Sequence, residues 1–432
     1  MVGHTKTVSI LKRIFRVARQ LSHWAAIQWL TLVILLTGAA ARVAAQEAVR
    51  FSLASEAAAQ SRKQSLEALD QSTLRTERLG LLVNTALDAE GNDNINLVEA
   101  PRQSDFIARA QLGTRLSWVA SEENVVQLAL DAGYSFYALH SEWDRFFVQP
   151  GSELSFDVYL GQWWINLHDR LAVSENAYDD PTLAGTGDYS QLRNTAGLSG
   201  TWDLNKLQLN LQYDHANYSS LTGSSLPDGR SDIFGGNAAI EVMPMTRVGL
   251  QLGGGPTHYD ATKARDSANL NVGAFARAQP TKHLSIFGAA GYTVYTDQNP
   301  DPGLSSSYDA FYWQIGVNHR LNRYFEYDLN GGRTISFGFF AGTVDMYSAA
   351  IDGRLHCFRN LNVNLGLLFE HGTVLSVSGE IFDRFGPHVV IERTLNRKLS
   401  ATLRYQYFAR ASNLAGGGYY LNVLTATLVY QL

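Results

Sequence analysis

From residue 79 to the end of the chain, apolar and polar residues alternate over long segments. Between residues 106 and 118 the even positions include Phe106, Leu112 and Trp118, whereas the odd positions include Arg109 and Arg115. A period of two is the pattern of a strand whose two faces meet different surroundings. Strands of ordinary sheets have about 5 to 6 residues, and a tilted strand needs about 9 to 11 to cross a bilayer. The long alternating segments therefore predict strands that span a membrane.

The same unit recurs along the chain, for example over residues 207–214, 270–277, 361–367 and 399–407. Short turns, such as residues 204–206 and 396–398, alternate with longer polar stretches, such as residues 175–189 and 297–307. Short periplasmic turns, long outer loops and an even strand number are typical of bacterial transmembrane barrels. We therefore predict an all-β protein, with a transmembrane antiparallel up-and-down β-barrel of about 18 strands over residues 80–432. Sixteen strands remain an alternative.

The N-terminal region has a different character. Residues 1–45 combine a basic segment (Lys12, Arg13, Arg16 and Arg19), an apolar segment over 24–36 and small residues at 43–45. This order is typical of a cleaved signal peptide. A retained membrane anchor is the alternative. Residues 46–79 are rich in Ala, Gln, Ser and Glu, which favours a short periplasmic helical arm or a flexible segment.

Charge and motifs exclude several classes of function. Without residues 1–45 the chain has 29 basic and 40 acidic residues, so it lacks the basic surface that nucleic acid requires. The single Cys357 forms no internal disulfide. The sequence has no nucleophile elbow, phosphate-binding loop or paired metal ligands. We therefore predict no catalytic residue and no cofactor, and a protein that is not an enzyme.

The candidate functional residues are the charged side chains on the predicted inner face. They are Arg109, Arg115, Asp131, Asp214, Arg277, Glu326, Asp328 and Arg404. Both signs of charge occur, so the set predicts no strong anion or cation selectivity. Alternatively, these side chains only pair with one another across the wall. Eighteen strands leave an interior that wall side chains cannot fill, so we expect an aqueous lumen unless the arm or a long outer loop plugs it.

One loop weakly resembles a calcium-binding loop. Asp297, Asn299 and Asp301 alternate oxygen ligands ahead of a glycine. Pro300 and Pro302 intrude, however, and no glutamate follows at the closing position. An ordinary solvated loop is favoured, and no metal is predicted.

Three short segments carry a resemblance to a known family. They are residues 88–96 (Asp-Ala-Glu-Gly-Asn-Asp-Asn-Ile-Asn), 104–106 (Ser-Asp-Phe) and 167–171 (Leu-His-Asp-Arg-Leu). With these, residues 80–432 resemble a family of bacterial outer-membrane porin-like barrels that is often associated with exopolysaccharide loci. The resemblance implies a channel in the outer membrane with a role in polysaccharide export. The family offers no catalytic residue to transfer.

Three functional hypotheses follow. The first is an outer-membrane porin-like channel for hydrophilic solutes, linked to exopolysaccharide export. The second is a barrel enzyme of the lipid hydrolase type, which would need a Ser and His cluster on the outer wall. The third is a structural or adhesive barrel with a blocked lumen. Expected partners are outer-membrane lipid and small hydrophilic solutes or polysaccharide, without nucleic acid, and a homo-oligomer is compatible with the sequence.

Overall fold

The structure is a computed structural model that describes residues 73–121, 124–222, 228–260, 266–298, 300, 305–338, 342–358, 360–375 and 379–432. The predicted signal peptide lies outside the described residues, as do Asn299, Asp301 and all of the predicted arm before residue 73. Within residues 73–79, Leu74–Arg75 form a short strand, β1, which pairs with the start of β2 through Leu74 and Leu81.

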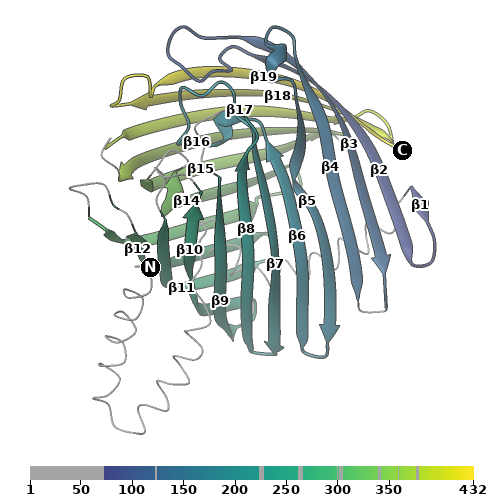
Figure 1. The fold of residues 1–432 in the computed structure, drawn as a ribbon. Coiled ribbons are helices and arrows are strands. Elements are labelled where there is room, and N and C mark those ends of the chain that lie inside the picture. The colour runs from purple at the N-terminus through teal and green to yellow at the C-terminus, as the bar shows by residue number, and fades with distance from the viewer. Residues whose placement is uncertain are drawn as a thin grey trace.

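Eighteen long strands form one closed antiparallel barrel (Figure 1). Their bounds are β2 Leu79–Asn92, β3 Asp105–Val119, β4 Val125–Tyr137, β5 Arg145–Leu160, β6 Trp163–Ser174, β7 Gln191–Leu204, β8 Leu207–Ser220, β9 Gly229–Met243, β10 Thr246–Tyr259, β11 Ser267–Thr281, β12 Leu284–Asp297, β13 Ser307–Arg320, β14 Phe325–Gly338, β15 Gly342–Phe358, β16 Leu361–Leu375, β17 Ile381–Thr394, β18 Leu399–Ser412 and β19 Tyr419–Gln431. The predicted fold class and strand number are confirmed.

Closure of the barrel depends on the pairing of the last strand with the first long one. β19 pairs antiparallel with β2, with Leu428 opposite Leu87, and every other long strand pairs with its two neighbours in sequence. A closed sheet has no free edge, so its backbone N–H and C=O groups are bonded without water. This is the condition for crossing a bilayer with strands.

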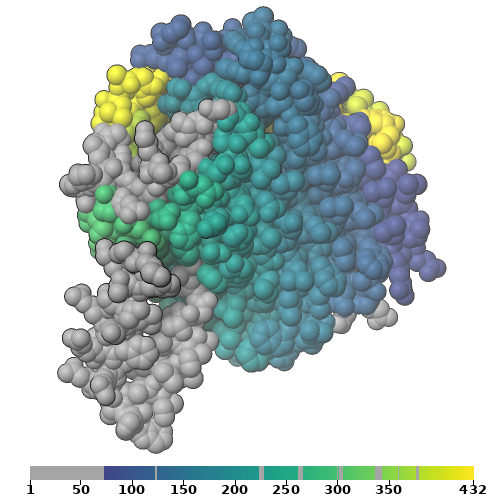
Figure 2. All heavy atoms as spheres, in the orientation of Figure 1, coloured from purple at the N-terminus to yellow at the C-terminus, as the bar shows by residue number. Residues whose placement is uncertain are grey.

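The outer face of the wall is apolar. Leu87, Leu211 and Leu250 have more than half of their surface exposed, with 61%, 61% and 68%, whereas the alternate positions carry polar side chains. Figure 2 shows the wall of β2 to β9 as a continuous outer surface. Apolar side chains that point outward all around a closed barrel require hydrocarbon as their surroundings. Among the described residues, no helix is both long and apolar enough to cross a membrane.

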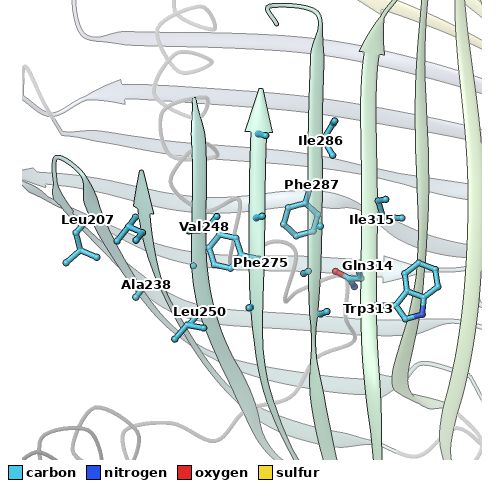
Figure 3. A pocket seen from close by; sticks show the side chains of 18 residues that line it. Leu207, Ala238, Val248, Leu250, Phe275, Ile286, Phe287, Trp313, Gln314 and Ile315 are labelled. Atoms are coloured by element: carbon cyan, nitrogen blue, oxygen red, sulfur yellow. The ribbon is translucent and has the colours of Figure 1, made fainter. Parts of the chain in front are cut away.

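A shallow hollow of about 1090 Å³ lies in this outer wall over β8 to β13 (Figure 3). Small outward-facing residues form its floor, namely Ala238, Ala274, Ala276, Gly288 and Ala290, and Leu207, Leu250, Ile286 and Trp313 surround them. On the inner side of the same strands, the ring of Phe275 lies against Gly249, where a Cβ would meet it at 2.7 Å. An aromatic ring that covers a glycine on a neighbouring strand fills the space that the glycine leaves.

Turns and loops alternate between the two ends of the barrel. The turns after β3, β5, β7, β9, β11, β13, β15 and β17 are short. The longest loops, residues 93–104 and 175–190, lie at the other end, where two loops contain the 3-10 helices η1 (Ser141–Trp143) and η2 (Ala177–Asp179). The end with short turns is the periplasmic end in barrels of this kind. The loop between β6 and β7, residues 175–190, is the longest connection between two of the long strands.

Candidate functional site

The loop of residues 175–190 extends from β6 into the interior and reaches strands far from β6. Arg384 of β17 donates from Nη1 to the carbonyl oxygen of Tyr178 at 2.6 Å, and Arg410 of β18 donates from Nε to that of Pro181 at 3.1 Å. In the order of the wall, β5, β4, β3, β2 and β19 lie between β6 and β18. The loop therefore crosses part of the lumen; we call it the inward loop.

An apolar cluster fixes the inward loop to the wall. Ala177, Leu183 and Tyr189 of the loop are buried together with Leu97 of the β2–β3 loop and with wall residues Phe408, Tyr419, Leu421 and Val423. A fully buried apolar side chain of this size contributes about 1.5–3 kcal/mol. Because the inner face is here apolar and covered, the loop is a packed part of the fold.

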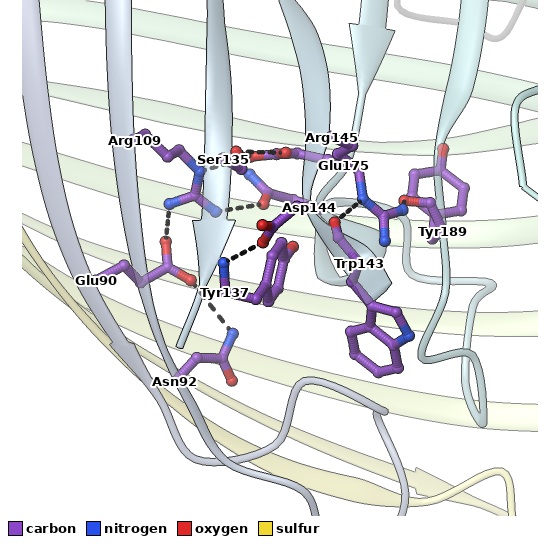
Figure 4. Close-up of polar contacts among 11 residues, drawn as sticks. Glu90, Asn92, Arg109, Ser135, Tyr137, Trp143, Asp144, Arg145, Glu175 and Tyr189 are labelled. Carbon is purple, nitrogen blue, oxygen red and sulfur yellow. Dashed lines mark hydrogen bonds and ion pairs between the residues drawn. The ribbon is translucent and has the colours of Figure 1, made fainter. Parts of the chain in front are cut away.

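A buried ionic network holds the start of the inward loop (Figure 4). Arg109 of β3 donates to Glu90 Oε2 at 2.7 Å and to Glu175 Oε1 at 2.5 Å. Its Nη2 also donates to Asn176 Oδ1 at 3.3 Å, and Ser135 Oγ donates to Glu175 Oε2 at 2.6 Å. All three charged side chains are almost fully buried. Removal of one partner of such a network leaves a buried charge unpaired, which costs more than the intact network gains.

Two further arginines, Arg384 of β17 and Arg410 of β18, hold the inward loop at Tyr178 and Pro181. Arg384 pairs with Glu370 at 2.6 Å and Arg410 with Glu380 at 2.9 Å, and both guanidinium groups are buried. Each arginine thus joins a carboxylate, that of Glu370 on β16 or of Glu380 just before β17, to a backbone carbonyl of the inward loop. Their charges are neutralised by the carboxylates, so these arginines anchor the loop rather than face a solute.

Burial affects the pKa of two carboxyl groups of the inward loop, Asp179 and Asp180. Desolvation raises the pKa of Asp179, although a hydrogen bond from Asn176 and the charge of Arg384 act in the opposite direction. Desolvation also raises the pKa of Asp180 against hydrogen bonds from Thr182. Burial raises the pKa of the Tyr178 hydroxyl well above its ordinary value. The inward loop therefore carries titratable groups that are partly withdrawn from water inside the barrel.

Three of the sequence-predicted residues lie close to the inward loop or face open lumen. Arg109 is the buried anchor described above. Arg404 is exposed on the inner face of β18, and its charge acts on Tyr178 and Asp179. Arg115 is exposed on the inner face of β3. Among the described residues, neither Arg115 nor Arg404 is in a direct ion pair.

The other five are separate from the loop, on the inner faces of their strands. Asp214 is buried and accepts from His168, and Asp131 lies beside Gly113 and Asn84. Glu326 accepts from Arg354 at 3.0 Å, and Asp328 accepts from Asn318 at 2.7 Å. Arg277 is partly buried on β11. These side chains are distributed around the wall and do not form one cluster.

Sequence reasoning missed most of the loop anchors. Glu90, Glu175, Glu370, Arg384 and Arg410 were not among the candidates. The signal for Arg410 was the same alternation that identified Arg109, because Arg410 lies between Ala409 and Ala411, whereas Arg384 lies between Asp383 and Phe385 and the pattern there is less clear. Glu175 belongs to a loop that the sequence proposed only as one of several plugs.

The motif at residues 167–171 also acquires a structural role. His168 and Arg170 face the interior, where Arg170 donates to Glu153 at 2.8 Å. Asp169 faces the other side and accepts from Asn194 at 2.5 Å. The candidate calcium residue Asp297 ends β12, and among the described residues there is no group of three or more His, Cys, Asp or Glu side chains placed to hold a metal ion.

No protein-family model matches the chain, and no curated protein matches it. Several solved structures have a similar fold. OpdK of Pseudomonas aeruginosa is 11% identical, with a TM-score of 0.47, over 82% of this chain and 98% of that one. OccK2 (OpdF) of P. aeruginosa in complex with glucuronate is 11% identical, with a TM-score of 0.49 and the same coverage. The channel DcaP of Acinetobacter baumannii is 11% identical, with a TM-score of 0.46, over 84% of this chain and all of the other.

The closed barrel, its apolar outer wall and its polar interior define a class. The protein has the fold of a porin-like transmembrane β-barrel. Inside the barrel, the inward loop joins β6 to β17 and β18.

Proposed function

We propose that the protein is a diffusion channel for small hydrophilic solutes, with its narrowest part at the inward loop. The observation that carries the proposal is the position of residues 175–190, which leave the wall at β6 and are bonded to β17 and β18. A loop that is packed across a water-filled barrel reduces the opening without closing the wall. Porin-like selectivity by size follows from such a constriction.

The exposed charged side chains near the inward loop support a channel whose lining carries both positive and negative groups. Arg404 faces the loop beside Asp179, and Arg115 lies on the inner face of β3, below Arg109 on the same strand. Opposite charges at a constriction create a field across the opening, which orients polar solutes and excludes apolar ones. We therefore propose solutes of a few heavy atoms that carry charge or hydroxyl groups.

The narrower predictions remain proposals. A role in exopolysaccharide export rests on the family resemblance alone, and the inward loop favours small solutes over a polymer chain. A homo-oligomer would place one wall against another, and the shallow hollow over β8 to β13 is a surface where this is sterically possible. A lipid hydrolase would need serine beside histidine on the outer wall, and among the described residues His215, His258 and His371 are hydrogen-bonded to aspartate and not to serine.

Conductance in planar bilayers tests the proposal. Wild-type protein should conduct. R384M/R410M should conduct more, because the inward loop loses its hydrogen bonds to β17 and β18. R323M is the matched control, since Arg323 lies in the exposed periplasmic turn after β13. A wild-type protein without conductance would favour the blocked, structural barrel. Equal conductance of R384M/R410M and R323M would contradict the role of the loop.

A further inference from the structure

The pairing of β13 with β14 ends before the outer ends of the two strands. Their register extends up to Trp313 and Arg333. Beyond this point, residues 307–312 of β13 pair with β12 alone, and residues 334–338 of β14 pair with β15 alone. Arg333 Nη1 donates instead to the carbonyl oxygen of Phe311 at 3.2 Å. In this part of the described chain, each of the two strands therefore has a neighbouring strand on one side only.

The outer ends of β14 and β15 lie on the lumen side of β12 and β13. Tyr308 belongs to the inward face of β13, because Phe311 and Trp313, at odd positions, are exposed on the outer wall. Asp345 belongs to the outward face of β15, two residues from the exposed Tyr347. The Tyr308 hydroxyl nevertheless donates to Asp345 Oδ2 at 2.9 Å. An inward side chain meets an outward one here because the wall overlaps itself, with β12 and β13 as the outer layer.

The burial of outward side chains supports the overlap. Ile335 of β14 and Thr343 and Asp345 of β15 are only 8%, 4% and 9% exposed. On the same faces of the same strands, Leu329 and Ile351 are 38% and 45% exposed. The outer layer therefore covers the outward face of β14 and β15 at their outer ends. It also shields strand edges that would otherwise be open to pairing with another chain.

A pocket of about 330 Å³ lies between the two layers, and we call it the overlap pocket. Tyr295, Asp297 and Tyr308 line it from the inward faces of β12 and β13. Thr343 and Thr373 line it from the outward faces of β15 and β16. Pockets for small molecules have volumes of roughly 300–1,000 Å³. The overlap pocket is therefore large enough for one small ligand.

Hydroxyl groups dominate the lining of the overlap pocket. Tyr295, Tyr308, Thr343, Thr373 and the serines at 305–307 each contribute one. Thr343 is 4% exposed, and no hydrogen bond of the Thr343 or Thr373 hydroxyl to another described residue is present. A buried hydroxyl without a partner costs free energy. A ligand rich in hydroxyl groups would satisfy these two side chains.

The charge of the overlap pocket favours a neutral ligand over an anion. Among the described lining residues only Asp297 is charged, and the nearby Arg333 is paired with Asp345 at 2.6 Å. Carboxylate oxygens accept hydrogen bonds from hydroxyl groups. Tyr295 and Tyr308, opposite each other in the register, combine an apolar ring with a polar hydroxyl. We propose that the overlap pocket binds a neutral sugar ring.

The overlap pocket is separate from the constriction of the channel. The inward loop bonds to β17 and β18, whereas the overlap pocket lies at the outer ends of β12, β13, β15 and β16. Sugar binding therefore goes beyond the proposed diffusion of solutes, and the two are measured separately.

Ligand-observed NMR titration of the intact barrel measures the dissociation constants of two sugars. Methyl glucopyranoside is the neutral probe, and methyl glucuronide is the same ring with a carboxylate. The micelles are made from a detergent without a sugar headgroup, so that the detergent does not compete. Conductance in planar bilayers verifies that each variant is folded, because every substitution leaves the anchors of the inward loop intact.

Two pocket variants each have a matched control. T343V/T373V removes two pocket hydroxyls with little change of shape. T425V/T427V is its control, because these threonines are partly buried on β19, outside the overlap pocket. S306W places a large side chain in the lining, and S104W places the same side chain in the exposed loop between β2 and β3.

We expect wild type to bind the neutral sugar about tenfold more tightly than the glucuronide. T343V/T373V and S306W should bind the neutral sugar about tenfold more weakly than wild type, whereas both controls should bind it as wild type does. Wild-type protein that conducts but binds no neutral sugar would overturn the sugar site and leave the channel intact. Equal affinity for the two sugars would also overturn it, as would pocket variants that bind like their controls.

Discussion

His168 of β6 and Asp214 of β8 are hydrogen-bonded at 2.8 Å although β7 lies between their strands. The bond passes over Gly197 of β7, which has no side chain to obstruct it. Nδ1 of His168 meets Asn166 Oδ1 at 2.9 Å, and the Asn166 amide donates to Asp157 at 2.8 Å. Both ring nitrogens thus lie within hydrogen-bonding distance of side-chain oxygens, so the imidazole joins Asp214 to Asn166 and Asp157 in one buried polar network.

Gly197→Ala should break this bridge. An added Cβ would meet Asp214 Oδ1 and lie 2.8 Å from His168 Nε2 and 2.6 Å from the Tyr213 carbonyl oxygen. Overpacking of this kind costs about 1–3 kcal/mol of unfolding free energy, measurable by urea titration of the barrel in micelles. Gly200→Ala on the same strand is the control, because nothing lies within 4 Å of its Cβ. Equal unfolding free energies of the two variants would show that the added methyl group does not disturb the hydrogen bond between His168 and Asp214.

His168→Leu should leave Asp214 buried without the hydrogen bond to its histidine partner. Both side chains are nearly inaccessible, with 1% and 3% exposure, and the loss of one partner of a buried pair costs about 3–5 kcal/mol. The double variant H168L/D214L removes both buried polar side chains and should recover part of the loss. Urea titration of the two variants decides the point, and a double variant less stable than H168L would contradict the pairing.

Arg404→Glu should change the ion selectivity of the channel. Arg404 is exposed in the lumen beside the inward loop, so a reversed charge there should increase the permeability of cations relative to anions. The measurement is the reversal potential in a gradient of KCl. Arg393→Glu is the control, because Arg393 is exposed at the periplasmic end of β17 on the opposite face. The same shift in both variants would mean that net charge, not the constriction, sets selectivity.

Acidification should favour anions and strengthen the packing of the inward loop. Burial raises the pKa of Asp179 and Asp180 above 3.8, so both protonate at a higher pH than free aspartate does. A carboxyl with a raised folded pKa opposes folding while ionised, and stability increases as the pH falls through that pKa. The reversal potential should therefore move toward anion preference on acidification. D179N/D180N should show a smaller movement, and an unchanged one would contradict the assignment to these carboxyls.

The alternation of residues such as Phe106, Leu112 and Trp118 with Arg109 and Arg115 was sufficient to predict the strands, their membrane-spanning length and the number of strands. Alternation is a local property, because each residue's face follows from its own backbone. The inner position of Arg109 and Arg404 could be read in the same way. Their different roles could not, since one is buried in a network and the other is exposed.

The sequence by itself determined a closed transmembrane barrel, because a strand of two unlike faces is stable only between two unlike solvents. The tertiary structure alone decided the path of the inward loop, the anchoring role of Arg384 and Arg410, and the bridge from His168 to Asp214 over Gly197. These features join residues far apart in the chain, and such contacts depend on the curvature and closure of the whole sheet, which no local pattern encodes.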